Sequence, residues 1–444
     1  MTLSGTELPV LATPVPGPAS RALARRLAAY ESPNITCQVP DPPICWEAAR
    51  GACVRDADGN LYVDLTAGFG VAHAGHANAA VAAAIGRQAG QLAHGLGDVF
   101  PAEVKVRLLE RLAAIAPGEL QITILASAGA EAVEAALKTA LLRTGRGGVL
   151  AFEGGYHGLT YGALAATHRP HFRQPFRSQL FAGVRFAPYP AEPAELEDAL
   201  AAVEREIALA EGTPWPVGAV LVEPIQGRGG LVEPPAGFLP ALRRLCDGHR
   251  MLLVCDEIYT GCGRTGRWFA CEHTGTVPDL LVLGKALSGS LPISATIGTR
   301  DAFAGWPAST GEAIHTSTFL GNPIGCAAAL AQLEEIESGG LLERAAELGR
   351  VIEQRTAGWL RRGWVRGRRG RGLLQGVALH STADGATVTA GALQRGVVLL
   401  AEGAGEVLAI TPPAVITDAQ LAYALDAIEA LLPRSEAGAR YGRS

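Results

Sequence analysis

Three ionisable residues each follow a run of apolar side chains. Glu223 comes after the run VGAVLV, Asp256 after MLLVC and Lys285 after DLLVLG. Such runs are typical of buried strands, and in open α/β sheets ligands bind at the carboxyl ends of the strands. If the three runs are neighbours in one sheet, we expect these side chains to share one site. A lone lysine after a strand is usually exposed, so the functional interpretation depends on the acidic residues beside it.

The combination of Lys285 with Asp256 indicates Schiff-base chemistry. A lysine shielded from water can bond an aldehyde through its amine and later move a proton at the substrate carbon. A carboxylate beside a pyridine nitrogen keeps that nitrogen protonated, so the ring can accept the electrons left when the proton departs. Asp256 alone could instead cap a helix. The long polar and glycine-rich stretch from Glu257 to Gly266 favours an active-site loop.

A strand-to-helix junction of small residues offers a place for a phosphate. The segment ILASAGAEAVEAALK ends a predicted strand at Ala126 and begins a helix near Ala130. Between them lie Ser127, Ala128 and Gly129. The N–H groups at the start of a helix bind anions, and small side chains let the ligand approach. Taken alone, this junction is a weak signal, and it gains meaning only beside the lysine and the aspartate.

The next predicted strand, GVLAF, leads into Glu153-Gly154-Gly155-Tyr156-His157-Gly158. Tyr156 offers an aromatic plane that can stack on a flat cofactor, although an ordinary packed tyrosine would have the same sequence context. For His157 two interpretations stay open. It either contributes to the site or is a hydrogen-bonded histidine of the loop.

Several ordered motifs together resemble those of the class III aminotransferases, which are pyridoxal 5′-phosphate enzymes of fold type I. The resemblance extends from the predicted hairpin around Asp58 to Thr411-Pro412-Pro413. It implies an aminotransferase that moves an amino group from an amino acid or amine donor to a 2-oxo acid in two half-reactions. It also implies a homodimer with shared active sites. The motifs are GGYHG (154–158), VEPIQGRGG (222–230), DEIYTGCGRTGRWFACEHTGTVPDLLVLGKALSGSLP (256–292) and HTSTFLGNP (315–323).

The resemblance assigns roles to individual residues. It implies that Lys285 forms the Schiff base and that Asp256 pairs with the pyridine nitrogen, and these two are the predicted catalytic residues. Ile258 then packs under the ring and Tyr156 stacks on its other face. No metal is expected. The predicted cofactor-binding residues are Ser127, Ala128, Gly129, Ala130, Tyr156, His157, Glu223, Gln226, Asp256, Ile258, Lys285 and Thr318.

Three further assignments follow from the same resemblance. Glu223 and Gln226 are predicted to support the cofactor on the side of its ring oxygen. The Ser127–Ala130 junction takes the phosphate position, where an Asn-Ser-Gly sequence is usual in the family, so backbone N–H groups must do more of the binding here. Thr318 is predicted to reach the phosphate bound in the neighbouring subunit.

Two departures from the family pattern concern the substrate. Many members carry a glutamate two residues after the glutamine of E-P-x-Q-G and an arginine three residues before the C-terminal Pro-Pro. This chain has Arg228 and Ala409 there. Arg228 could bind a substrate carboxylate bidentately or pair with an acidic residue such as Glu402. Phe69 and Arg228 are the predicted substrate-binding residues, and with Tyr156 they suggest room for an apolar group and one anion.

Two other functions were weighed against aminotransfer. An amino-acid racemase or epimerase stays open, because no residue prevents return of the proton to the substrate carbon, and the missing arginine makes this alternative more plausible. A binding or regulatory protein without chemistry is disfavoured, because such a protein would need neither Lys285 nor Asp256.

The elements that must position these residues form an α/β pattern. Near-continuous apolar runs separated by helical segments predict a mostly parallel sheet flanked by helices. The chain has 444 residues, of which 48% are hydrophobic, enough for a large core and two connected domains. The strand runs are 122–126, 148–152, 217–224, 251–257 and 279–284.

A smaller α+β domain is predicted from both termini. Gly51 to Ala67 indicates a hairpin around Asp58-Gly59, preceded by an irregular proline-rich arm and a helix beginning at Ser20. The tract RRGWVRGRRGRG (361–372) is interpreted as a solvated turn before a strand and not as a nucleic-acid patch. Further elements are a helix at 326–336, strands at 371–379 and 397–401, and a helix at 419–432. The predicted boundaries are 1–75 for the arm and part of the small domain, 76–325 for the large cofactor-binding domain and 326–444 for the C-terminal small domain.

Charge and cysteine content narrow the partners and the location. The net charge is −5 with a pI near 6.1, so no overall positive field attracts nucleic acid or an anionic membrane. The eight cysteines form no C-x-x-C pair and are too sparse for a disulfide framework. There is neither a signal-peptide pattern nor an apolar run near the ~18 residues of a membrane helix. We therefore expect a cytoplasmic enzyme of small molecules.

Overall fold

The structure is a computed structural model that describes residues 3–36 and 43–434 and divides into two compact units. The first unit combines Met1–Asn78 with Ala346–Ser444, and the second is Ala79–Ala345. The domain boundaries were predicted after residues 75 and 325, and the two units of the structure divide after residues 78 and 345. The second boundary lies later because α11 (Pro323–Ser338) packs against α3 (Ala79–Gln91) and α4 (Glu103–Ile115) of the second unit.

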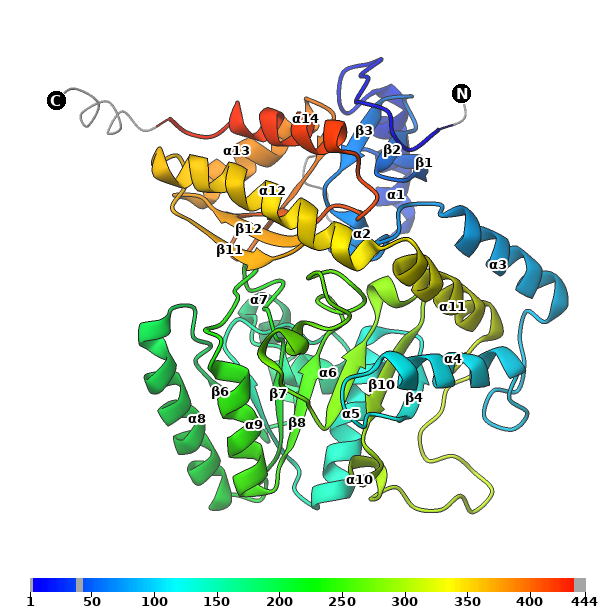
Figure 1. Cartoon of the computed structure of the whole chain (residues 1–444), viewed down its shortest axis with the longest axis vertical. Coiled ribbons are helices and arrows are strands. Elements are labelled where there is room, and N and C mark those ends of the chain that lie inside the picture. Colours follow the sequence, from blue (N-terminus) through cyan, green and yellow to red (C-terminus); the bar gives the residue numbers. More distant parts are fainter. Residues whose placement is uncertain (1–2, 37–42, 435–444) are drawn as a thin grey trace. The chain divides into compact units, whose positions relative to one another are not determined.

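Among the described residues of the second unit, seven strands form one sheet in the order β4-β10-β9-β8-β7-β5-β6 (Figure 1). β10 is antiparallel to both of its neighbours, and the other pairs are parallel. The prediction of a mostly parallel α/β sheet is confirmed. The strands are β4 (Ile122–Ala126), β5 (Gly148–Phe152), β6 (Val184–Ala187), β7 (Val217–Val222), β8 (Leu252–Asp256), β9 (Leu280–Leu283) and β10 (Ser294–Gly298).

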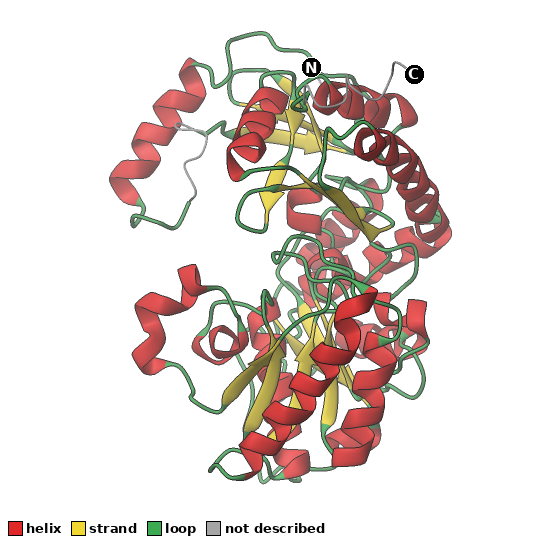
Figure 2. Cartoon of the chain, turned by 90° about the vertical axis from the view of Figure 1, so that its left-hand side faces the viewer, coloured by secondary structure: helices red, strands yellow, loops and turns green. Residues whose placement is uncertain are grey.

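Helices flank this sheet on both sides (Figure 2). α5 (Gly129–Thr144) packs along β7 to β10, while α8 (Leu196–Glu211) and α9 (Phe238–His249) pack on β7 and its neighbours. α5 buries mainly alanines, such as Ala132 and Ala136, and these small side chains let the helix approach the strands closely. The shorter helices are α6 (Tyr161–Ala166), α7 (Pro170–Arg173), α10 (Arg300–Phe303), and the 3-10 helices η1 (Gln174–Gln179), η2 (Pro193–Glu195), η3 (Ala270–Thr274) and η4 (Lys285–Leu287).

The first unit contains the predicted hairpin. β2 (Cys53–Asp56) pairs antiparallel with β3 (Leu61–Asp64), and Gly59 turns the chain between them with a φ of 84°. Asp58 of the same turn accepts hydrogen bonds from the N–H groups of Ala19 and Ser20 at 2.6 and 2.8 Å. These bonds cap the start of α1. The other elements here are α1 (Pro18–Tyr30), β1 (Trp46–Arg50), α2 (Ala67–Gly70) and β13 (Val397–Val398), which is parallel to β3.

A second sheet of the first unit, in the order β11-β12-β15-β14, includes part of the arginine-rich tract. β11 (Gly367–Arg371) pairs antiparallel with β12, so the expectation of a turn over the whole tract was wrong. The tract can form an edge strand because its arginines tolerate exposure, and charged side chains are common on such edges. The remaining elements are α12 (Leu341–Arg361), β12 (Leu374–Ala378), α13 (Thr382–Leu393), β14 (Leu400–Glu402), β15 (Val407–Ile410) and α14 (Asp418–Glu429).

In the described part of the chain, no helix combines the length and the apolar character needed to cross a membrane.

Candidate active site

A cavity of about 520 Å³ lies in the second unit, where several strands of the large sheet end. This volume is in the range of small-molecule sites. Nine of the predicted site residues line it, together with four that were not predicted. The lining residues are Gly129, Ala130, Tyr156, His157, Gly158, Leu159, Thr160, Glu223, Arg228, Asp256, Ile258, Tyr259 and Lys285.

Asp256, the last residue of β8, forms a buried pair with His157. The His157 Nδ1 atom lies 2.7 Å from Asp256 Oδ2, and the two side chains are 1% and 4% exposed. Burial opposes a charge on the imidazole, but the hydrogen bond and the negative charge of Asp256 outweigh it and raise the pKa of His157. Ile258 N donates to Asp256 Oδ1 at 3.1 Å. The carboxylate is therefore held by a hydrogen-bond partner on each of its two oxygens.

Lys285 lies two residues beyond the end of β9, in a strained backbone conformation. Its φ is +44°, in the left-handed region that non-glycine residues seldom adopt. Such strain persists only where the surroundings enforce it, and it is concentrated at functional sites. The preceding Gly284 packs closely against Ile258, because a Cβ on the glycine would lie 3.3 Å from Ile258 Cγ2. Lys285 Nζ lies 3.8 Å from the centre of the Tyr259 ring.

The N-terminus of α5 lies at the cavity, as the phosphate prediction requires. Gly129 and Ala130 line the cavity, and Ala128 provides no side-chain cap for the first N–H groups of the helix. These groups lack partners within a helix and attract anions. Ser127 and Ala128 themselves are not among the lining residues, and Ser127 N donates to Glu131 Oε2 at 2.9 Å.

Glu223 connects two walls of the cavity. One carboxylate oxygen accepts a hydrogen bond from Tyr156 N and the other from Gly227 N, both at 2.9 Å. Burial, reinforced by the negative charge of Asp256 and opposed by His157, raises the pKa of Glu223 to about 7. Gln226 is buried outside the lining, where its Nε2 atom donates to Glu153 O at 2.7 Å.

Arg228 and Tyr156 form a cationic wall of the cavity. The guanidinium carbon of Arg228 lies 5.4 Å from the centre of the Tyr156 ring. Arg169 Nη1 donates to the main-chain carbonyl of Arg228 at 2.5 Å, and Phe172 packs edge-on against Tyr156 with ring centres 5.7 Å apart. The main chain of Arg228 is therefore held by the hydrogen bond from Arg169.

Two predicted residues lie elsewhere. Phe69 belongs to the first unit, in the turn that follows β3, and 48% of its surface is exposed within the chain. Thr318 lies in an exposed turn of the second unit and is not among the residues that line the cavity.

Sequence reasoning missed Tyr259 as a site residue, along with Gly158, Leu159 and Thr160. A signal for Tyr259 was present, because it lies three residues after Asp256 in the stretch that was already interpreted as an active-site loop. The direction of its ring is not readable from that position.

Comparison with known proteins defines the family. The sequence profile of the class III aminotransferases matches residues 36–432. An acetylornithine aminotransferase of Corynebacterium efficiens is 38% identical, covering 88% of this chain and 93% of its own. A 4-aminobutyrate aminotransferase of Mycobacterium bovis is 36% identical, covering 95% and 97%. The solved ornithine aminotransferase of Toxoplasma gondii superposes with a TM-score of 0.83 at 30% identity, covering 94% and 96%.

The chain therefore belongs to the class III aminotransferases. It is a pyridoxal-phosphate-dependent enzyme that transfers amino groups.

The residues of the cavity fit this cofactor. An uncapped helix N-terminus is available for the phosphate, a charge-balanced carboxylate for the ring nitrogen, and a lysine for the aldehyde. Gly129, at the start of α5, lies close to Ile258 in the loop that follows β8. A Cβ on Gly129 would lie 2.8 Å from Ile258 Cδ1, so the side chain of Ile258 would have to shift. Ile258 can thus keep a place beside a flat ring.

Proposed function

We propose that this aminotransferase uses the cavity of the second unit as its active site and takes donors that carry a carboxylate as well as an amine. The observation that carries the proposal is the presence of Lys285, the His157–Asp256 pair and Arg228 in one cavity. Lysine and aspartate supply the chemistry, and the arginine selects the substrate.

The catalytic roles follow from the charges of these side chains. When bound, the cofactor supplies the aldehyde that accepts the amine and the ring that holds the electron pair left by the departing Cα proton. Asp256, oriented by its hydrogen bond with His157, would hold a proton on the ring nitrogen of the bound cofactor. Lys285 Nζ would take the Cα proton as general base and then, as general acid, would give it to the cofactor carbon that carried the aldehyde oxygen. The N-terminus of α5 anchors the phosphate.

Arg228 is the proposed receptor for the carboxylate of the substrate. A guanidinium pairs bidentately with a carboxylate, and the ring of Tyr156 lies within cation–π distance of this guanidinium, with 5.4 Å between its carbon and the ring centre. Three relatives are named for acetylornithine, 4-aminobutyrate and ornithine, each of which carries an amine and a carboxylate, and another is named for putrescine, a diamine without a carboxylate. The position of Arg228 in the cavity therefore carries the proposed preference for carboxylates. Phe69 is proposed to contact the apolar part of the substrate. The alternative partner for Arg228 is Glu402, a buried residue of β14 in the first unit.

Single-turnover measurements test the overall proposal. The holoenzyme is mixed with single L-amino acids, ω-amino acids or simple amines without an oxo acid, while the visible absorbance of the cofactor, the oxo product and the chirality of the remaining substrate are followed. We expect bleaching with release of an oxo product, and loss of both in K285A. Conversion of an L-amino acid to its D form without oxo product would make the enzyme a racemase.

Substitution of Arg228 tests the substrate class. R228A should raise the Michaelis constant of carboxylate-bearing donors roughly 10-fold or more, the value of a charge-assisted hydrogen bond, and leave simple amines unaffected. E402Q is the matched control, because it removes the alternative partner and keeps the guanidinium. Unchanged constants for every carboxylate donor in R228A would refute the assignment.

We further propose a homodimer in which Thr318 serves the neighbouring active site. The second unit exposes large apolar side chains on two adjoining segments, among them Phe100 at 71% and Phe319 at 61%. The segments are joined by Thr316 Oγ1, which donates to Asp98 at 3.1 Å, and by packing of His94 on Phe319. Exposed apolar patches of this kind mark protein interfaces.

Mixing two inactive variants tests the shared site. K285A and T318R homodimers should each be inactive or weak. Their heterodimers contain one site with both wild-type residues if Thr318 acts across the interface, so mixing restores up to one functional site per heterodimer. If Thr318 acts within its own chain, mixing restores nothing.

A cytoplasmic location is proposed from the cysteines. Every cysteine in the described ranges is a free thiol, and all but Cys45 are buried. Free thiols are typical of reducing compartments. Fractionation of the producing cell with an antibody to this chain checks the location.

A further inference from the structure

The ring of Tyr259 lies directly against the amine of Lys285. The Nζ atom is 3.8 Å from the ring centre, well within the ~6 Å at which a lysine ammonium is attracted to an aromatic face. Both residues line the same cavity. The tyrosine therefore touches the group to which the proton-transfer role was assigned above.

Gly227 makes the room for this ring. A Cβ on Gly227 would lie 2.5 Å from Tyr259 Cδ1, closer than real Cβ contacts. The glycine itself is held by the hydrogen bond from its N–H to Glu223 Oε2. The ring is thus confined between the backbone of Gly227 and the amine of Lys285.

The backbone of Tyr259 is also fixed. On one side Ile258 N donates to Asp256 Oδ1, and on the other Gly261 N donates to Glu257 O at 2.9 Å. The carboxylate of Glu257 is buried and accepts hydrogen bonds from the N–H groups of Ala270 and Cys271 at 2.9 and 2.8 Å. These buried hydrogen bonds fix the main chain from which the ring extends.

We propose that Tyr259 is a positioning residue that stabilises the protonated form of Lys285 after the lysine has taken the Cα proton. The proton would move from the substrate carbon to Nζ, the electron pair of the C–H bond would pass to the cofactor ring, and Nζ would then give a proton to the cofactor carbon that carried the aldehyde oxygen. A neutral amine interacts weakly with the ring face, whereas an ammonium is attracted by the ring quadrupole. Proton uptake is therefore favoured. This inference rests on the proposed role of Lys285.

Other charged groups face the same cavity and must be held constant in the test. Asp256 is balanced by His157, Glu223 is held by two main-chain N–H groups, and Arg228 is cationic. A change at position 259 that keeps the volume leaves these charges in place. The ring quadrupole is then the variable.

The experiment compares Y259F, which keeps the ring, with Y259M and Y259L, which remove it. With a carboxylate-bearing donor, Y259M and Y259L should lower the rate of the half-reaction roughly 2- to 30-fold, the range of cation–π energies, while Y259F stays near the wild type. Fluorinated phenylalanines introduced at position 259 should lower the rate stepwise as the ring face loses negative potential. If the rate does not follow ring fluorination, the ring does not act electrostatically.

A direct readout of the lysine accompanies the kinetics. After the first half-reaction the amine of Lys285 is no longer bonded to the cofactor, and its acylation can be followed by mass spectrometry as a function of pH. In Y259M the midpoint of the profile should fall by roughly 0.4 to 1.5 pH units, because the ammonium has lost its ring. Altered access changes the plateau rate, not the midpoint. An unchanged midpoint in both Y259M and Y259L would overturn the inference.

K285A separates this inference from the proposed function. If K285A keeps the half-reaction, the lysine assignment fails and the role of Tyr259 fails with it. If K285A abolishes the half-reaction while the fluorinated series and the labelling profiles do not change, only the role of Tyr259 fails.

Discussion

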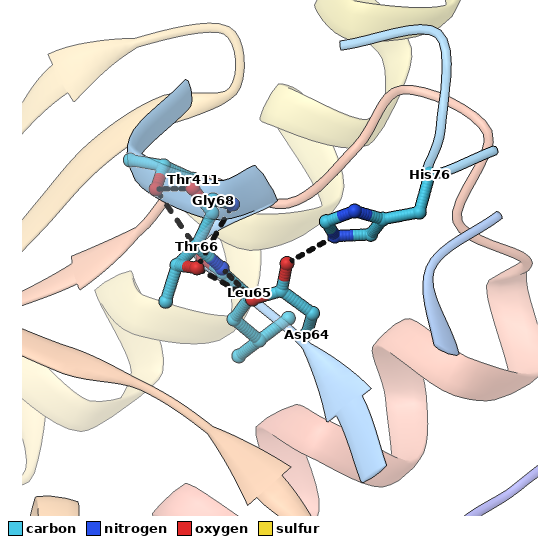
Figure 3. Close-up of polar contacts among 6 residues, drawn as sticks. All are labelled: Asp64, Leu65, Thr66, Gly68, His76 and Thr411. Atoms are coloured by element: carbon cyan, nitrogen blue, oxygen red, sulfur yellow. Dashed lines mark hydrogen bonds and ion pairs between the residues drawn. The ribbon is translucent and has the colours of Figure 1, made fainter. Parts of the chain in front are cut away.

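Each unit of this enzyme contains an aspartate that ends a strand and pairs with a histidine. In the second unit Asp256 ends β8 and lies 2.7 Å from His157 Nδ1. In the first unit Asp64 ends β3 and lies 2.8 Å from His76 Nε2 (Figure 3). Chemistry and distance are nearly the same, so they do not distinguish a catalytic pair from a structural one.

The other hydrogen bonds of the two aspartates make the difference. Asp64 is fully buried, and its Oδ1 atom accepts from Thr66 N at 2.7 Å and from Thr66 Oγ1 at 2.6 Å. Its hydrogen bonds hold the local chain. Asp256 accepts one hydrogen bond from the main chain of its own loop, and it lines the cavity. A carboxylate that faces a cavity is available to a ligand, and one enclosed by its own turn is not.

The Asp64–His76 pair of the first unit lies beside a turn with left-handed backbone angles. Ala67, Gly68 and Phe69 have φ values of 48°, 56° and 61°, and left-handed geometry costs about 1–2 kcal/mol for each residue with a side chain. Gly70 N donates to Thr66 O at 2.8 Å, and Thr411 Oγ1 donates to Leu65 O at 3.3 Å. These contacts enforce the turn that carries Phe69.

The largest expected effect separates the two aspartates by activity. D256N should lower kcat by roughly 10²- to 10⁴-fold, because an amide cannot keep the ring nitrogen protonated, while stopped-flow binding of the cofactor persists. D64N is the control. The carboxylate of Asp64 is enclosed by its own turn, so this variant should keep kcat within a few-fold. Equal losses of kcat in the two variants would remove the distinction.

A second carboxylate of the cavity, Glu223, makes the stability of the fold depend on pH. An acid whose pKa is raised by folding binds its proton more tightly in the folded state, so folded stability falls as pH rises from the ordinary value of 4.5 to about 7. Relative to E223Q, the cofactor-free protein should lose on the order of 3 kcal/mol across this window and nothing further above it. Urea unfolding at a series of pH values measures the difference. A difference that is independent of pH would contradict the raised pKa.

H157N tests whether the imidazolium matters for catalysis. Removing the positive partner leaves Asp256 buried with one hydrogen bond, and we expect kcat to fall roughly 10- to 100-fold, as for other residues that orient a reactive group. The raised pKa also means that the ionic pair stabilises the fold at acidic pH and weakens as pH rises beyond the ordinary histidine range. A kcat within two-fold of the wild type would show that Asp256 needs no histidine.

The smallest effects are expected in the first unit and on stability. D64N should lower the free energy of unfolding by about 1–3 kcal/mol, because it disturbs buried hydrogen bonds to Thr66, and H76N by about 1 kcal/mol. Thermal and urea unfolding measure both. If Phe69 binds substrate, D64N and H76N should also raise the Michaelis constant for donors with an apolar side chain. This change in the Michaelis constant should be larger than the change in kcat.

Local sequence determined much of this protein. Apolar runs ending in Glu223, Asp256 and Lys285 located the strands and the edge at which ligands bind, because burial on both faces requires near-continuous apolar residues. The Asp58-Gly59 turn predicted the hairpin, because only certain residues adopt the required backbone angles. The combination of Lys285 with Asp256 indicated Schiff-base chemistry from residue types alone.

Tertiary structure decided which side chains meet. The sequence left His157 undecided, and only the order of the strands, in which β7 alone separates β5 from β8, brings it to Asp256, 99 residues away in the chain. It did not reveal that Gln226 would donate to Glu153 outside the cavity lining, or that Tyr259 would lie against Lys285. The physical reason is that a side chain's partner depends on strand order and on the space left by neighbours such as Gly227, and neither is contained in the local pattern of residues.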